Sequence, residues 1–206
     1  MRFITVILKN LLRRKVRSVL TIVGISIGVA AVVAMTAIAW GFEKSWTRAY
    51  TARGTDLAVT KTSSKSPMPA PFDVGMLEEL RKLPGVKSTS GLLSDFVGIE
   101  ESPGMILFGW EPGSFLWDHL KLVEGRWPKE GEKAVVLGTV SAELLDKKPG
   151  AKVQIDVSEY EVCGIYESTA LVENGAVVMM LGEMQKLSDN PGKVNFVNLR
   201  LDPSVT

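Results

Sequence analysis

The feature that most constrains this 206-residue chain is an uncharged stretch that runs from Ser18 to Phe42. Its central part, Val19 to Ala39, would form a helix roughly 31 Å long at ~1.5 Å per residue, close to the ~30 Å hydrocarbon core of a bilayer. Its polar side chains are hydroxyls that can bond to a carbonyl one turn earlier: Thr21, Ser26 and Thr36. A core helix of a soluble domain would normally be shorter and carry a polar face. The stretch therefore predicts a transmembrane helix over residues 19–42.

The charges of the chain divide at Glu43. Overall, 24 Lys and Arg nearly balance 23 Asp and Glu, for a formal net charge of +1. Residues 1–42 contain basic but no acidic side chains, so acidic side chains outnumber basic ones in residues 43–206. The chain lacks the bulk positive charge of a nucleic-acid-binding protein, and its 46% hydrophobic content excludes intrinsic disorder. The near-neutral total hides two regions of opposite charge.

A basic cluster directly before the apolar run sets the expected orientation. The cluster consists of Arg13, Arg14, Lys15 and Arg17. Lys and Arg are enriched on the cytoplasmic side of membrane helices. We therefore expect a chain held in the lipid bilayer of the cell (inner) membrane, with its N-terminus in the cytoplasm and residues 43–206 outside it.

Aromatic residues follow the apolar run at Trp40, Phe42, Trp46 and Tyr50. Such rings settle at the membrane–water interface. Trp46 and Tyr50 fit the core of the following domain equally well.

A cleaved signal peptide is the main alternative to a retained anchor. Ala37-Ile38-Ala39 has the A-x-A form of a cleavage site. The uncharged stretch is much longer than the about 7–15 residues of a signal h-region, and the preceding 1–18 segment is long for an n-region. The pattern favours the anchor.

Residues 1–18 predict an amphipathic elbow helix with a basic polar face. Its apolar residues recur at a spacing of three to four: Ile4, Ile7, Leu8, Leu11 and Leu12. Such a helix would lie in the cytoplasmic headgroup layer. It could also continue the membrane helix inward, or touch a cytoplasmic partner.

Within the apolar run, Gly24 and Gly28 form a GxxxG pattern that Ala31 extends on nearly the same face. Small residues at this spacing let another membrane helix approach closely. The pattern predicts that this helix packs against another membrane helix, although small residues are also common in membrane helices.

Residues 43–206 predict a mixed α+β extracytoplasmic domain, as one unit or two subdomains. Periodicity and turn residues predict strands over 55–60, 86–98, 105–110, 134–137, 153–157, 160–166, 176–180 and 194–201. They predict helices over 74–83, with Asp73 as N-cap, and over 140–145 and 181–187. Residues 100–104 read as a turn between two strands.

No catalytic, metal or cofactor site is predicted. His119 and Cys163 are the single histidine and cysteine. We expect His119 to be packed or at the surface, and Cys163 to be a small buried apolar residue. The chain contains neither a P-loop nor a G-x-S-x-G motif, and Glu100-Glu101 fits a solvated turn better than a catalytic carboxylate pair.

Three stretches, in order, resemble the MacB-type or FtsX-like ABC transporter permeases. The first is the basic elbow and apolar run, whose matching residues are Lys15, Arg17, Ser18, Leu20, Thr21, Gly24, Ile25, Ile27, Gly28, Val29 and Ala30. The second comprises Glu124–Trp127, Glu132, Val135–Gly138 and Ala142. The third comprises Pro149–Val153 and Tyr160–Ile165. The resemblance covers nearly the whole chain.

The resemblance implies a role in transport without catalysis by this chain. Permeases of this kind pair with a separate or fused ABC ATPase and usually work as dimers, so the implied partners are a separate ATPase subunit and a second permease subunit. ATP hydrolysis in the cytoplasm would move the membrane helices and, through them, the extracytoplasmic domain.

The chain departs from the family pattern because it has one apolar run where family members usually have four membrane helices. It therefore resembles an N-terminal fragment whose core domain, residues 43–206, is incomplete at its C-terminus. Two other hypotheses stay open: a single-pass anchored binding or scaffold protein, and, with less support, an extracytoplasmic enzyme.

Overall fold

The computed structural model describes residues 14–63 and 68–203. The chain divides into two compact units, Met1–Lys44 and Ser45–Thr206. The second unit contains the 43–206 region from Ser45 onward. Of the elbow expected over 1–18, residues 1–13 lie outside the described part, and Lys15 and Arg17 belong to the first described helix.

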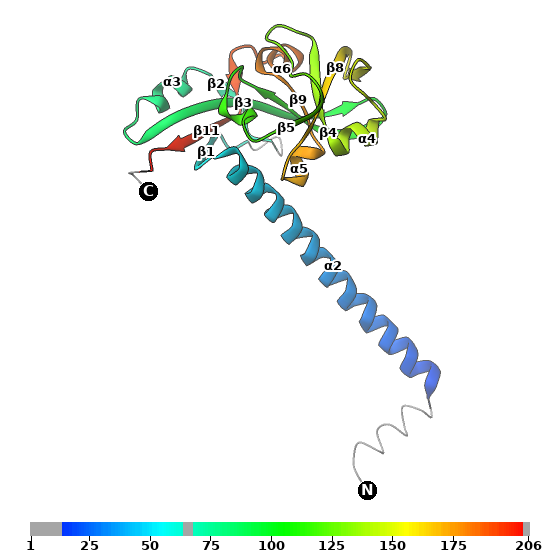
Figure 1. Cartoon of the computed structure of the whole chain (residues 1–206). Helices are drawn as coiled ribbons and strands as arrows, with labels where there is room; N and C mark the ends of the chain where they lie inside the picture. The colour runs from blue at the N-terminus through cyan, green and yellow to red at the C-terminus, as the bar shows by residue number, and fades with distance from the viewer. Residues whose placement is uncertain (1–13, 64–67, 204–206) are drawn as a thin grey trace. The chain divides into compact units, whose positions relative to one another are not determined.

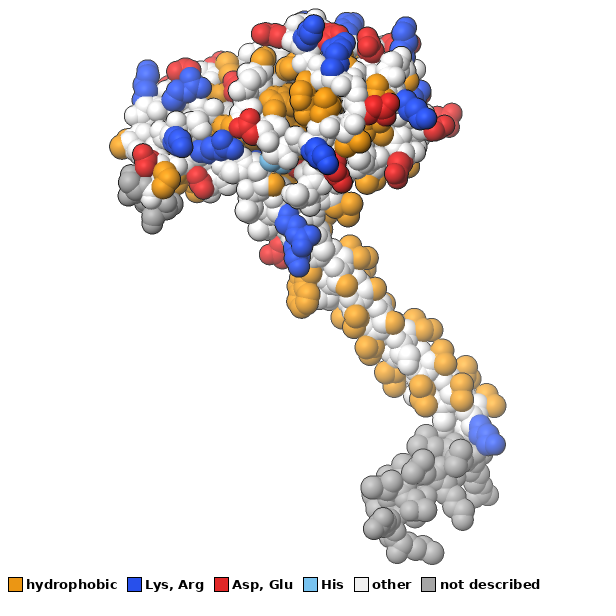
Figure 2. Space-filling view, in the orientation of Figure 1, with side chains coloured by type: hydrophobic (Ala, Val, Ile, Leu, Met, Phe, Trp, Pro, Cys, Tyr) orange, Lys and Arg blue, Asp and Glu red, His pale blue; other side chains and the backbone are white. Residues whose placement is uncertain are grey.

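Helix α2 (Lys15–Arg53) contains the whole apolar run and continues beyond it. Among the described residues it is the one helix long and apolar enough to cross a membrane, with a mean hydropathy of 2.4 in its best window. Its large apolar side chains are exposed along the helix, and Figure 2 shows those on the face in view as orange atoms. Thr21 and Thr36 donate to the carbonyls of Arg17 and Val32 at 2.9 Å, as expected for hydroxyls in an apolar helix.

The second unit is built on a nine-stranded mixed sheet (Figure 1). Its strands are β1 (Leu57–Thr60), β3 (Val86–Ile99), β4 (Ser102–Trp110), β5 (Lys121–Gly125), β6 (Ala134–Gly138), β7 (Lys152–Ile155), β8 (Ser158–Glu167), β9 (Val177–Met180) and β11 (Phe196–Leu201). The order is β1-β11-β3-β4-β9-β6-β8-β5, with β7 joining β3 and β8. The pairs β4/β9 and β6/β8 are parallel and the others antiparallel. A separate ribbon pairs β2 (Phe72–Asp73) with β10 (Lys193–Val194).

Both faces of the central strands are buried. Along β9, Val177 and Met179 belong to one hydrophobic cluster, and Val178 between them belongs to the other. The same alternation holds at Val135 and Val136 of β6, because successive side chains of a strand point to opposite faces. A sheet covered on both faces explains why these strands are apolar throughout rather than alternating.

Helices cover one face of the sheet. They are α3 (Met76–Arg81), α4 (Thr139–Leu145) and α6 (Leu181–Leu187), which place Leu77, Ala142 and Met184 in the first cluster. The other cluster lies around the short helix η1 (Phe115–Trp117), with Trp46 of α2 packed against it. A last short helix, α5 (Leu171–Asn174), precedes β9.

Three details differ from the sequence predictions. Asp73 does not cap α3: its carboxylate accepts from the Gly75 amide at 2.7 Å in a turn, and the helix begins later, at Met76. The turn predicted over 100–104 is confined to Glu100 and Glu101, and β4 already begins at Ser102. Strand β5 was not predicted, because its exposed positions hide the strand pattern.

Close backbone packing explains the glycines of the second and third motifs. Gly125 at the end of β5 has φ +80°, and a Cβ there would lie 2.3 Å from the Cys163 carbonyl oxygen on β8. A Cβ on Gly164 would lie 2.5 Å from the carbonyl oxygen of Arg126. The close pairing of β5 with β8 therefore requires glycine on both strands.

Arg126, which directly follows Gly125, pairs with Glu132 of the same motif. Arg126 donates from Nη1 to Glu132 at 2.8 Å and from Nη2 to the other carboxylate oxygen at 2.5 Å. The hydrogen bond from Arg126, helped by the Lys129 amide, lowers the pKa of Glu132 to about 2. The pair lies at the surface and fastens the loop between β5 and β6.

We expect Glu132→Gln to lower the free energy of unfolding at pH 7 by about 0.5–1 kcal/mol, as for other exposed pairs. Because the folded pKa lies below the ordinary 4.5, the wild-type advantage is complete above pH 4.5 and disappears as the pH falls toward 2. Urea unfolding of wild type and variant across this window measures the difference. A difference that does not change with pH would contradict the pairing.

Candidate functional site

The candidate site lies within the second unit, where the last turns of α2, from Ser45 to Arg53, pack onto the sheet domain. Ser45, Ala49 and Arg53 follow one another at a spacing of four and lie on one side of the helix. The Ser45 hydroxyl accepts from the Val172 amide at 3.1 Å, Ala49 is fully buried, and Arg53 is 2% exposed. This spacing fixes the end of the helix to α5 and to the sheet.

The C-terminus of α2 is closed by a Schellman motif. Gly54 has φ +64°, its amide donates to the Thr51 carbonyl, and the Thr55 amide donates to the Tyr50 carbonyl, both at 3.0 Å. Arg200 of β11 then donates to the carbonyls of Arg53 and Gly54 at 2.8 and 3.1 Å. A cation at the negative end of a helix stabilises that end.

Glu173 of α5 is the centre of a buried polar network. Its Oε1 accepts from Nε of Arg53 at 2.6 Å, and its Oε2 contacts Nε2 of His119 at 2.8 Å. Ser168 also donates to Oε2, and Tyr166 donates to the Glu173 carbonyl at 2.6 Å. Arg53 and Glu173 lie 120 positions apart in the chain, so the network joins the end of α2 to the far half of the domain.

The network keeps the buried carboxylate charged. Burial alone would raise the pKa of Glu173, but the His119 hydrogen bond, the charges of Arg53 and His119 and the Ser168 hydroxyl together lower it. An ionised carboxylate only accepts hydrogen bonds, so Nε2 of His119 carries a proton. Burial and the Glu173 charge raise the pKa of the Tyr166 phenol, which stays protonated and donates.

The serine, histidine and glutamate are not arranged for nucleophilic catalysis. In a catalytic triad the imidazole lies between the hydroxyl and the carboxylate and takes the hydroxyl proton. Here the carboxylate of Glu173 lies between Ser168 and His119. Among the described residues, no group of three or more His, Cys, Asp or Glu could hold a metal ion.

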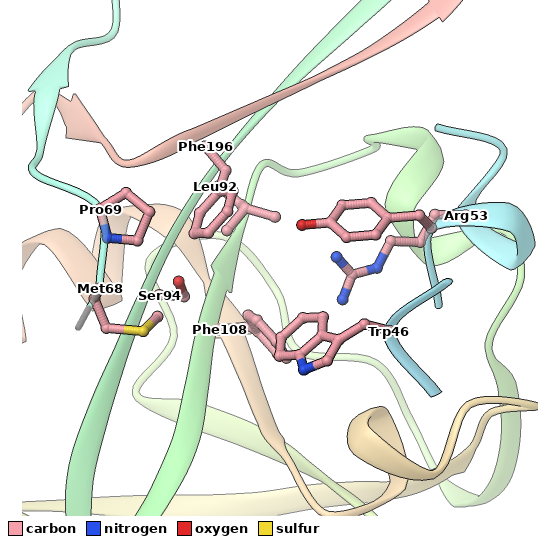
Figure 3. Close-up of a pocket in the computed structure, with 9 residues that line it drawn as sticks. Trp46, Arg53, Met68, Pro69, Leu92, Ser94, Phe108 and Phe196 are labelled. Atoms are coloured by element: carbon pink, nitrogen blue, oxygen red, sulfur yellow. The ribbon is translucent and has the colours of Figure 1, made fainter. Parts of the chain in front are cut away.

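A pocket of about 380 Å³ opens beside this network (Figure 3). Its lining is mainly apolar and aromatic: Trp46, Tyr50, Arg53, Met68, Pro69, Leu92, Ser94, Phe108 and Phe196. All nine residues belong to the second unit. The Arg53 guanidinium points into the space between these side chains, as Figure 3 shows.

Aromatic rings surround the same guanidinium. Its Cζ lies 5.2 Å from the ring centre of Phe108, 5.3 Å from that of Trp110 and 5.9 Å from that of Tyr50. These distances suit cation–π contacts. Arg53 is therefore held by one carboxylate and by three rings.

None of the described residues predicted as sites belongs to this network. Arg14 precedes α2, Lys15 and Arg17 lie in its exposed first turns, and Arg13 lies outside the described residues. Gly24 and Gly28 leave open space: no described atom lies within 4 Å of a Cβ placed on either. Ala31 is exposed on the same helix.

The aromatic residues after the apolar run, and the single histidine and cysteine, differ in their exposure. Trp46 packs against the second hydrophobic cluster and Tyr50 is half-buried, whereas Trp40 is 70% exposed. His119 is packed, with 8% of its side chain exposed. Cys163 is buried, which raises the pKa of its thiol to about 11.

Sequence reasoning missed the network. Arg53, Ser168 and Glu173 lie in segments without a motif, and nothing in the spacing links Arg53 to a glutamate 120 positions later. The available signal was an arginine followed directly by glycine, shortly after the apolar run. It predicts a helix end and not a buried pair.

Comparison with known proteins decides the family. Residues 18–206 match the model of the MacB-like periplasmic core domain. The chain belongs to this family. The match begins inside the apolar part of α2 and includes the whole sheet domain.

Solved structures agree with this MacB-like fold. The periplasmic region of MacB from Actinobacillus actinomycetemcomitans superposes with a TM-score of 0.57 at 14% identity, over 75% of this chain and 79% of that chain. The extracellular domain of the noncanonic ABC-type transporter YknZ from Gram-positive bacteria gives a TM-score of 0.54 at 16% identity, over 72% and 83%. The predicted α+β class with a preceding apolar helix is confirmed.

One curated relative matches over nearly the whole MacB-like chain. It is an uncharacterized ABC transporter permease, MJ1507, of Methanocaldococcus jannaschii, 25% identical over 211 aligned residues. The alignment covers 95% of this chain and 53% of the relative. The chain therefore spans about half the length of this permease.

Proposed function

We propose that the chain is the N-terminal part of the permease subunit of a MacB-type ABC transporter. The single observation that carries the proposal is the family match over residues 18–206, which joins an apolar helix to a MacB-like core domain. The permease named among its relatives supports the same role. In such a system the partner ATPase hydrolyses ATP, and this chain transmits the resulting motion.

The proposed organisation keeps the three predicted segments. Residues 1–18 form a cytoplasmic elbow, residues 19–42 cross the cell membrane, and residues 43–206 form the extracytoplasmic core domain. Arg14, Lys15 and Arg17 hold the N-terminal side in the cytoplasm. Gly24, Gly28 and Ala31 offer the surface on which a membrane helix of a second permease subunit packs.

In this proposal the network of Arg53, Glu173 and His119 is the joint, meaning the contact through which the end of α2 moves the sheet domain. Motion of α2 reaches the domain only if the end of the helix is firmly held. The Arg53 side chain is bonded to Glu173 inside the domain, and Arg200 donates one hydrogen bond to the Arg53 carbonyl and one to the Gly54 carbonyl. A buried charge pair is costly to separate, so the joint moves as one piece.

The orientation is tested by labelling with a membrane-impermeant maleimide in intact cells. Single cysteines replace Arg14 or the 86% exposed Val157 in a Cys163→Ser background. We expect Val157→Cys to react in intact cells stripped of any outer membrane, and Arg14→Cys only after permeabilisation, because lipid blocks the reagent. The opposite pattern would reject the proposed topology.

The partner is tested by co-expression with ABC ATPases from the same genome, followed by size-exclusion chromatography in detergent. We expect one ATPase to co-elute with the chain at a defined ratio. A chain that has the expected topology but binds no ATPase would instead support a single-pass anchored binding protein.

A further inference from the structure

The pocket beside Arg53 combines two chemical properties. Its walls are mainly apolar, from Leu92, Phe108 and Phe196 of the sheet and from Trp46 of α2. The cation of Arg53 points into it, with 2% of the residue exposed. Its volume of about 380 Å³ lies in the about 300–1,000 Å³ range of small-molecule sites, which typically combine apolar walls with a few polar groups.

Arg53 has hydrogen-bonding capacity that the protein leaves unused. Within the described ranges, Glu173 is the acceptor that its side chain reaches, and it takes only Nε. Nη2 is buried and has no hydrogen-bond partner among the described residues. A buried donor without a partner costs free energy, so native structures seldom contain one unless a ligand or water completes it.

A carboxylate fits this unused capacity. Arginine binds carboxylates through parallel hydrogen bonds from two nitrogens, and these charge-assisted bonds are stronger than neutral ones. Glu173, which His119 holds in turn, orients the guanidinium from one side, while the pocket lies on the other. The aromatic and aliphatic walls suit an unbranched alkyl chain.

We propose that this pocket binds a single-chain amphiphile with one carboxylate head, the fatty-acid class. The carboxylate pairs with the terminal nitrogens of Arg53, and the alkyl chain lies against Leu92, Phe108 and Phe196. The pocket is partly open, which allows the ligand to enter. This inference concerns the core domain alone and stands whether or not the chain serves an ATPase.

The experiment uses the full chain in phosphatidylcholine nanodiscs and a decanoate that carries a diazirine near the end of its alkyl chain. After irradiation, mass spectrometry maps the labelled peptides, and unlabelled decanoate or 1-decanol competes. We expect label on peptides that contain Phe108 or Phe196. We expect decanoate to compete at about tenfold lower free concentration than 1-decanol, because the alcohol lacks the charge-assisted bonds.

Two variants separate binding from folding. Ser94→Leu fills the pocket and leaves Arg53 in place, and its expected effect is loss of labelling. The matched control is Ser88→Leu on the same strand β3, outside the pocket lining, which should label like wild type. Arg53→Met should remove the preference for decanoate over decanol, and tryptophan-fluorescence melting checks that each variant is folded.

Labelling that persists in folded Ser94→Leu, or that falls outside the pocket peptides, would overturn the proposal. Equal competition by decanoate and 1-decanol in wild type would overturn the role of Arg53 and therefore the carboxylate. Absence of any labelling of the wild-type chain would likewise overturn the proposal.

Discussion

Replacing Glu173 with glutamine is expected to lower the free energy of unfolding of the core domain by about 3–5 kcal/mol, the usual cost of removing one partner of a buried pair. The glutamine retains the size of the side chain but leaves the Arg53 cation buried without a counter-charge. It also weakens the acceptor for His119 and Ser168. Urea unfolding of the full chain in detergent, followed by tryptophan fluorescence, measures the loss.

A local readout distinguishes this prediction from general damage. The end of α2 depends on Arg53, so the amides of residues 50–55 should exchange hydrogen faster in Glu173→Gln than the amides of β6 and β9. The matched control is Glu132→Gln, which removes a carboxylate from an exposed pair and should cost about 1 kcal/mol or less. Equal losses in the two variants would contradict a desolvated Arg53–Glu173 pair.

The double variant Arg53→Met, Glu173→Gln tests whether the loss in Glu173→Gln comes from the unpaired Arg53 charge. It removes both charges, so no charge remains buried without a partner. We expect it to be more stable than Glu173→Gln alone, because buried ion pairs are often replaced by apolar groups at little cost. In the proposed transporter this variant would test whether the joint needs its charges or only its packing.

Replacing Gly125 with alanine is the second large effect that we expect. A left-handed backbone disfavours a side chain by about 1–2 kcal/mol. The new Cβ would also meet the Cys163 carbonyl at 2.3 Å, and forced overpacking adds about 1–3 kcal/mol. The backbones of the paired strands β5 and β8 must therefore move apart. Urea unfolding of the variant measures the combined loss of free energy of unfolding.

Gly131 offers a control with nearly the same φ angle. Its φ is +76° against +80° for Gly125, but no described atom lies within 4 Å of a Cβ placed there. Gly131→Ala should therefore show only the conformational cost, about 1–2 kcal/mol. If both alanine variants lose the same stability, the close approach of β5 to β8 does not matter.

Secondary structure was predictable wherever one residue pattern dominated. The apolar run from Val19 to Ala39 predicted a helix on its own, and α6 was predicted with its observed bounds, Leu181–Leu187. Errors arose where tertiary contacts decide the local structure. Asp73 makes a turn rather than a cap, and β5 is a strand because it pairs with β8, although its side chains are mostly exposed.

Residue order alone was enough to predict the long apolar helix, the acidic α+β domain after it and the three motifs in family order. Hydropathy and backbone preferences act over a few residues, so they can be read from a linear pattern. The buried network of Arg53, His119 and Glu173 beside an apolar pocket became visible in the folded domain alone. Their pairing depends on how the sheet brings distant segments together, and no local pattern in the chain records that arrangement.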